Sequence, residues 1–142
     1  MYIGVFIDSE NIHDLGVFLG KTQEEINDQF TEYVIDMIMG GATLKREAIE
    51  YGEDRLVVYK DDFFLVMEVF KVDDDKVYLV NWHGYDGVNF EVRDFPTKKD
   101  AYNTMREEYI EEVQYMQEGY LDHDTAIIDV GTEWLNWKII NY

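Results

Sequence analysis

Residues 56–92 read LVVYKDDFFLVMEVFKVDDDKVYLVNWHGYDGVNFEV, and this stretch decides the fold. Runs rich in Val, Phe, Tyr and Leu alternate with short polar clusters, a pattern typical of β-strands separated by turns. The predicted strands are Leu56–Tyr59, Phe63–Val72, Lys76–Trp82 and Val88–Val92. Because the connections are short, we expect these strands to pair in chain order as antiparallel hairpins, which makes a meander. Apolar residues on both sides of the third strand predict a sheet that is covered, at least partly, on both faces.

Two amphipathic helices are expected on either side of this stretch. Thr22 and Glu25 form a capping-box pattern, and Thr97 with Asp100 repeats it with Asp in place of Glu. Glycines at 40–41 and 119 are the expected stops. Apolar residues recur at spacings of three and four, which places them on one helix face. They are Ile26, Phe30, Tyr33, Val34, Met37 and Ile38 in the first helix, and Tyr102, Met105, Tyr109, Val113 and Met116 in the second.

The remaining segments complete an α+β fold. Tyr2–Ile7, Thr125–Val130 and Trp134–Ile140 are expected strands. Asp8–Leu19 is compatible with a loop that contains a helical turn, and Ala42–Tyr51 suits a short helix. We therefore predict a mainly antiparallel β-sheet (a meander) with two amphipathic helices packed on it. A chain of 142 residues fits a single domain over 1–142, and no internal repeat is evident.

The composition restricts the partners of the protein. The chain has 31 Asp and Glu against 12 Lys and Arg, a formal net charge of -19. It is also 46% hydrophobic and 15% aromatic, which is enough to bury a core and unlike a charge-driven disordered chain. A strongly negative surface repels nucleic acid and anionic membranes and attracts basic protein surfaces. Since the chain has no Cys and no long apolar run, we expect a cytoplasmic protein, in the host cytoplasm if a phage encodes it.

The acidic residues gather in two stretches. No Lys or Arg lies between Lys21 and Lys45, which enclose five acids, and none lies between Arg106 and Lys138. Like charges four residues apart on a helix cost a few tenths of a kcal/mol per pair. They also repeat at about 6 Å, close to the spacing of phosphates along a nucleic-acid strand. The predicted partner-binding residues are Glu107, Glu108, Glu111, Glu112, Glu118, Asp122 and Asp124, with Tyr109 and Tyr120 as aromatic anchors.

These observations favour a non-enzymatic acidic protein that docks on a basic protein surface. In size, charge and lack of Cys the chain resembles the small acidic proteins of phages and mobile elements, which include nucleic-acid-mimicking inhibitors such as anti-CRISPR proteins. The resemblance implies a partner with a nucleic-acid-binding surface, no direct nucleic acid or membrane ligand, and no cofactor. It rests on no shared motif, so it assigns no residue a role. The competing interpretation is a generic acidic domain whose charge serves solubility alone.

A second function class comes from residues 5–12, VFIDSENI. This segment resembles the opening of the NYN/PIN-like nuclease domains, in which a strand ends in Asp and the next residues begin a helix. The resemblance implies that Asp8 helps to bind a divalent metal, that Asn11 supports the site, and that a parallel sheet surrounds them. A metal-dependent nuclease using Asp8 is thus the alternative. The acidic turns at 61–62 and 73–75 lack EF-hand spacing and are predicted as hairpin turns. Asp122-His123-Asp124 could serve as a base with an orienting carboxylate, or simply form a loop.

Overall fold

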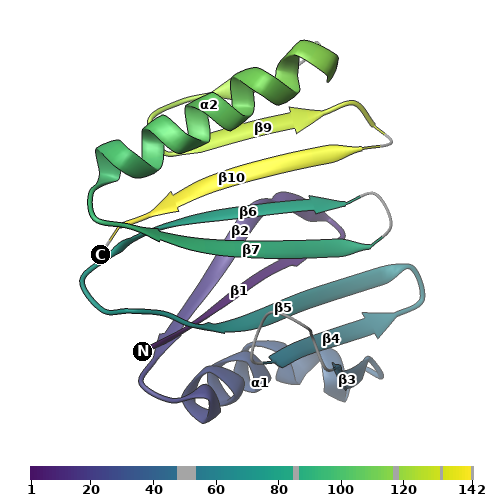
Figure 1. Cartoon of the computed structure of the whole chain (residues 1–142). Coiled ribbons are helices and arrows are strands. Elements are labelled where there is room, and N and C mark those ends of the chain that lie inside the picture. The colour runs from purple at the N-terminus through teal and green to yellow at the C-terminus, as the bar shows by residue number, and fades with distance from the viewer. Residues whose placement is uncertain (48–53, 85–86, 117–118, 132, 142) are drawn as a thin grey trace. The chain divides into compact units, whose positions relative to one another are not determined.

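The computed structural model describes residues 1–47, 54–84, 87–116, 119–131 and 133–141. It divides into two compact units, Met1–Val72 and Asp73–Tyr142. Within the described residues, each unit contains one five-stranded antiparallel sheet and one helix (Figure 1). The α+β prediction is therefore confirmed. The single domain over 1–142 was predicted without this division, and it stays a prediction.

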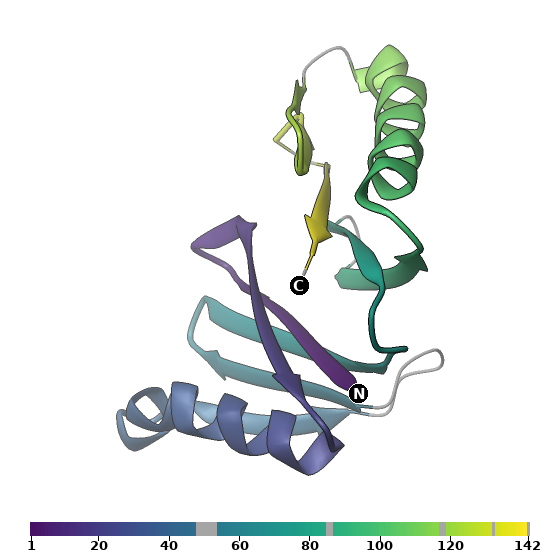
Figure 2. The same cartoon turned by 90° about the vertical axis from the view of Figure 1, so that its left-hand side faces the viewer.

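The first unit begins with a hairpin, continues with a helix and ends with three strands. Its elements are β1 (Tyr2–Asp8), β2 (Asn11–Gly20), α1 (Gln23–Met39), β3 (Thr43–Glu47), β4 (Asp54–Lys60) and β5 (Phe63–Lys71). The strands are ordered β2-β1-β5-β4-β3 in the sheet. Helix α1 lies along one face of this sheet and buries Ile26, Phe30 and Val34 against it (Figure 2). The sheet side of this core is Leu56, Val58, Leu65, Met67 and Val69.

The second unit has the same succession of elements. They are β6 (Val77–Gly84), β7 (Val88–Phe95), α2 (Lys98–Met116), β8 (Tyr120–Leu121), β9 (Thr125–Asp129) and β10 (Trp134–Ile140). The strand order is β7-β6-β10-β9-β8, which matches the order in the first unit. Helix α2 buries Ala101 and Met105 against the sheet (Figure 2). The sheet side of this core includes Ala126, Ile128, Trp137 and Ile139, with Leu135 packed against it.

The two units also share their strand register. Tyr2 pairs with Gly20 in the first hairpin, and Val77 pairs with Phe95 in the equivalent hairpin. Val77 follows Tyr2 in the chain by the same number of residues as Phe95 follows Gly20. Val58 pairs with Leu65 in the first unit, and the equivalent pair in the second unit is Ile128 with Leu135, again with equal displacement of both partners. The chain is thus an internal structural repeat. The expectation that no repeat exists is wrong at the level of structure.

The meander is interrupted once. The β4–β5 and β6–β7 hairpins form as predicted. However, β5 pairs with β1 and β4, whereas β6 pairs with β7 and β10. Residues 73–75 therefore connect the two units and do not turn a hairpin. Asp61, in the short β4–β5 turn, has a φ of 53°, a left-handed conformation that Asp tolerates better than most side chains.

Two predictions from the sequence were wrong. Within Asp8–Leu19, Asp8 ends β1 and Asn11–Leu19 forms most of strand β2, because it pairs with β1. Thr43–Glu47 forms β3, because it pairs with β4; the rest of the predicted helix, residues 48–51, lies outside the described residues. In both cases pairing with a distant strand overrides a weak local preference.

The caps of both helices agree with the sequence prediction. Thr22 Oγ1 accepts a hydrogen bond from the Glu25 N–H at 3.1 Å, and Thr97 Oγ1 accepts one from the Asp100 N–H at 3.2 Å. Glycine ends the first helix, since the Gly40 N–H donates to the Asp36 carbonyl oxygen. Both faces of β6 carry buried side chains, as expected. In the described ranges, neither helix is long and apolar enough to cross a bilayer.

Candidate protein-binding surface

The acidic residues predicted on α2 divide into two groups. Glu107 and Glu111 are exposed and Glu112 is half-buried. Across the part of the chain that the structure describes, no Lys or Arg forms an ion pair with any of these three carboxylates. They remain available to a partner from outside the chain.

Glu108 has a different role. Its carboxylate accepts two hydrogen bonds of 2.7 Å from the Arg93 guanidinium and a third, of 3.1 Å, from Trp137 Nε1. These donors hold the pKa of Glu108 below its ordinary value, with the Arg93 hydrogen bonds as the main cause, and Glu108 in turn raises the pKa of Arg93. The Glu108 side chain thus ties α2 to β7 and β10, and its carboxylate is committed to the fold.

The first unit makes the same helix-to-sheet contact with different chemistry. Tyr33 lies as far along the chain from the Thr22 cap as Glu108 lies from the Thr97 cap, so the two residues are equivalent in the repeat. Phe18 on β2 is equivalent to Arg93 on β7 by the same comparison. The Phe18 and Tyr33 rings lie 5.9 Å apart, centroid to centroid, in an edge-on arrangement. An aromatic pair in one unit is therefore replaced by an ion pair in the other. This equivalence explains why Glu108 belongs to the packing of its unit.

The two predicted aromatic anchors also differ. Tyr109 packs against the core, and its ring meets that of Trp137 edge-on at a centroid distance of 6.4 Å. Tyr120 is 55% exposed, and its hydroxyl donates to Asp122 Oδ2 at 2.8 Å. Only Tyr120 presents most of its ring to solvent. Glu118 lies outside the described residues.

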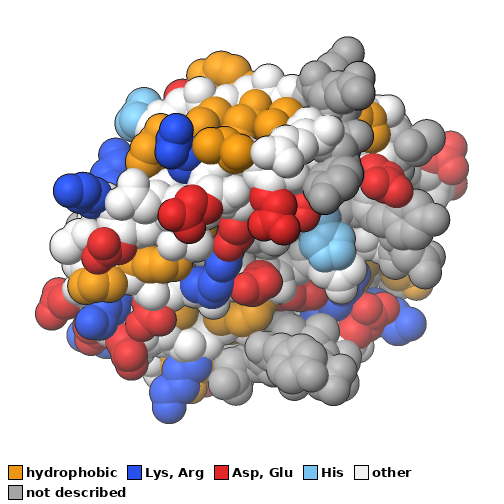
Figure 3. All heavy atoms as spheres, turned by 45° about the horizontal axis from the view of Figure 1, so that its top comes forward, with side chains coloured by type: hydrophobic (Ala, Val, Ile, Leu, Met, Phe, Trp, Pro, Cys, Tyr) orange, Lys and Arg blue, Asp and Glu red, His pale blue; other side chains and the backbone are white. Residues whose placement is uncertain are grey.

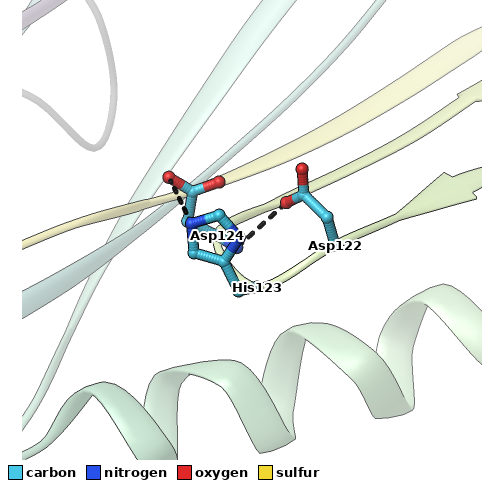
Figure 4. A group of neighbouring side chains, drawn as sticks. All are labelled: Asp122, His123 and Asp124. Carbon is cyan, nitrogen blue, oxygen red and sulfur yellow. Dashed lines mark hydrogen bonds and ion pairs between the residues drawn. The ribbon is translucent and has the colours of Figure 1, made fainter.

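The residues after α2 form a hydrogen-bonded turn between β8 and β9. Asp122 Oδ1 accepts hydrogen bonds from the N–H groups of Asp124 and Thr125. These bonds, with the one from Tyr120, lower the pKa of Asp122 to about 2. Figure 4 shows Asp122, His123 and Asp124 side by side, with His123 Nε2 at 3.8 Å from Asp124 Oδ2. Their ligand atoms lie within 4.8 Å of one another, but His123 is 76% exposed and the Asp122 oxygens already cap the turn.

The first unit carries acidic residues that the site prediction left out. Five acids on α1 are exposed: Glu24, Glu25, Asp28, Glu32 and Asp36. Glu32 and Asp36 occupy the helix positions of Glu107 and Glu111, counted from the N-caps. The helix-face pattern alone could have identified them, since all five fall off the apolar stripe.

Few of the described acids form ion pairs, and Asp14 on β2 and Asp94 on β7 form none with a described residue. In the described ranges, the acids paired with Lys or Arg are Glu47, Glu68, Glu91 and Glu108. The first three lie on strands, and Glu108 faces one. The charge is divided almost equally, with 15 acids and 6 bases in the first unit and 16 acids and 6 bases in the second. On the face shown in Figure 3, acidic side chains stand in small groups among hydrophobic and basic ones.

Asp8 lies in a different setting from the one that the nuclease resemblance implies. It ends β1, but a hairpin follows, because Asn11 begins β2. Its Oδ1 accepts hydrogen bonds from the N–H groups of Glu10 and Asn11 at 2.8 and 2.9 Å, and from Asn11 Nδ2 at 3.4 Å. All strand pairs in the described part of the chain are antiparallel. Asp8 therefore caps a hairpin turn, without the helix and the parallel sheet of that family.

Comparison with known proteins does not identify a relative. No family model, curated protein or solved structure matches this chain.

Proposed function

We propose that this protein is a non-enzymatic acidic binding protein that docks, through the solvent faces of its helices, on a basic surface of another protein. The observation that carries the proposal is an unpaired acidic face on each helix: Glu32, Asp36, Glu107 and Glu111 are exposed and form no ion pair with a described residue. An arginine- or lysine-rich surface would complete these pairs.

The positions of these carboxylates oppose helix stability, which supports a role outside the fold. Glu32 and Asp36 are four residues apart, as are Glu107 and Glu111, so each pair is repulsive. Asp36 also lies in the last turn of α1, where the helix dipole disfavours negative charge. Neither helix has a basic residue in its last turn. Costs without a local benefit are expected where function selects the residues.

The sharper form of the proposal is that the partner surface normally binds nucleic acid. Two carboxylates separated by one helical turn present negative charge at roughly 6 Å, a spacing that phosphate-binding Arg and Lys side chains can follow. Competition provides the test of this form. Double-stranded DNA should displace the protein from a basic nucleic-acid-binding probe.

The experiment uses immobilised protamine as that probe and two variants of equal net charge. The helix variant carries E32Q, D36N, E107Q and E111Q. The turn variant carries D61N, D62N, D73N and D75N, four exposed acids in the turns at 61–62 and 73–75. We expect the helix variant to bind about tenfold more weakly than the turn variant, and wild-type binding to weaken as salt rises. Equal loss in both variants, or binding that is indifferent to salt, contradicts the proposal.

A further inference from the structure

An exposed isoleucine stands beside the acidic pair on both helices. Ile35 is 44% exposed and Ile110 is 37% exposed. Ile35 lies between Glu32 and Asp36 in sequence, and Ile110 lies between Glu107 and Glu111. Each helix therefore contains the pattern Glu-x-x-Ile-Asp/Glu, with the apolar side chain and both carboxylates in solvent.

The two patterns occupy the same place in the repeated fold. Ile35 lies as far along the chain from the Thr22 cap as Ile110 lies from the Thr97 cap. The core positions agree in the same register, since Phe30 and Met105 also stand equally far from their caps and both are buried. The isoleucines thus lie off the packed stripe in both units.

The two halves share few residues at equivalent positions, and the isoleucine and the Glu before it are among them. Between residues 2–39 and 77–114, only five aligned positions are identical: Val5/Val80, Val17/Val92, Thr22/Thr97, Glu32/Glu107 and Ile35/Ile110. Thr22 and Thr97 are helix caps, so the fold explains their identity. The fold gives no such reason for an exposed Ile and an exposed Glu one helical turn before it.

We infer that the protein has two equivalent docking faces, Glu32/Ile35/Asp36 and Glu107/Ile110/Glu111. Each face binds a basic protein segment that presents an apolar side chain between Lys or Arg residues. The isoleucine supplies the apolar contact at the centre, and the carboxylates bind the flanking cations. A desolvated apolar centre with a polar rim is the usual arrangement of a protein-binding hot spot. The inference rests on the proposed function and adds to it the number of faces and the apolar requirement.

Charge complementarity decides the occupant. A second copy of this chain would bring two acidic faces together, which is unfavourable. An anionic membrane is repelled for the same reason. A cationic segment without an apolar residue would leave the isoleucine in water, so such a segment should bind more weakly.

The test uses two synthetic probes of equal charge, a lysine-rich peptide with one central leucine and the same peptide with serine in its place. Isothermal titration of the full chain should give two leucine peptides per chain, bound about tenfold more tightly than the serine peptide. Either I35S or I110S alone should reduce the tight sites to one. The double variant should lose the preference for leucine and keep the weaker, salt-sensitive binding.

Two exposed apolar residues outside the faces provide matched controls. L44S on β3 and V130S, after β9, should leave both tight sites intact. Thermal unfolding should show that all four single variants are folded. If both peptides bind wild type equally, or if the isoleucine variants keep the preference, this inference fails while the proposed function stands. If neither peptide binds at low salt, the proposed function fails as well. A dimer of the chain that I35S dissociates would also overturn the inference, since the faces would then bind each other.

Discussion

Glu107 and Glu108 are adjacent in the chain, and their carboxylates have different surroundings. Glu107 is exposed, whereas Glu108 is 33% exposed and accepts hydrogen bonds from Arg93 and Trp137. The sequence could not separate the two, because Arg93 and Trp137 reach Glu108 only through the register of β6 with β7 and β10. A charge pattern identifies acids on a helix but does not reveal which of them meets a base from the sheet.

Alanine substitution should therefore distinguish these neighbours. E108A leaves the Trp137 N–H without its acceptor and the Arg93 guanidinium with Glu91 as its remaining described ion-pair partner, so we expect the free energy of unfolding to fall by about 1–2 kcal/mol. E107A should change it by less than about 0.5 kcal/mol, because it removes an exposed side chain. Urea denaturation at neutral pH measures both. A similar cost for the two variants would show that Glu108 does not fasten α2 to the sheet.

The stability difference between wild type and E108A should also depend on pH. Because the pKa of Glu108 is lowered from 4.5, its stabilisation is complete above that value and is lost as the pH falls through the lower folded-state value. The difference between wild type and E108A should thus be constant near neutral pH and shrink below about pH 4. Comparing the two proteins at each pH cancels the effect of the other acids. A difference that grows on acidification contradicts this assignment.

At the scale of elements, the helices were predictable because their signals are local. The caps at Thr22 and Thr97 and the apolar stripes all lie within the helix or next to it. Strands β2 and β3 were missed because their pairing partners, β1 and β4, determine their conformation. Ile35 and Ile110 were overlooked for a related reason: a search for the packed stripe passes over an apolar residue that falls outside it.

Glu107 and Glu111 on α2 should lower the free energy of unfolding and strengthen binding to a basic partner. E111Q removes the like-charge contact with Glu107 and a negative charge from the C-terminal half of the helix. We expect it to raise the free energy of unfolding by a few tenths of a kcal/mol. The same change should weaken salt-sensitive binding to protamine. Chemical denaturation and binding, measured on one preparation, test both effects. A variant that is less stable, or that binds protamine as well as wild type, would contradict the argument.

At the scale of the whole molecule, the antiparallel α+β class was predicted correctly, and the repeat was not. The class follows from strand and helix patterns that each segment carries by itself. The repeat lies in the register and the order of strands, and five identities between residues 2–39 and 77–114 are too few to reveal it. The Asp-rich segment 73–75 reads as a hairpin turn in the sequence, although it joins two sheets.

The net charge of the whole chain predicts that added salt stabilises the folded protein and weakens its binding to a basic partner. With a net charge of -19, the folded protein repels itself, and added ions screen this repulsion. The unfolding temperature should therefore rise between about 10 and about 300 mM NaCl, over which range the Debye length falls from about 30 Å to well below about 10 Å. Binding to protamine should fall over the same range. Calorimetry and binding at matched salt test the pair of trends. An unfolding temperature that falls with salt would mean that attractive ion pairs dominate.

The register that β1 and β2 share with β6 and β7 has an evolutionary consequence. Tandem duplication of one coding segment produces two units with the same strand register, and the register can persist after most residues have changed. Each unit of hairpin, helix and three strands has its own hydrophobic core, as a single-copy ancestor would need. Separate change in the two halves would then leave an edge-on aromatic pair in one and an arginine–glutamate pair in the other, while both keep an exposed isoleucine on the helix.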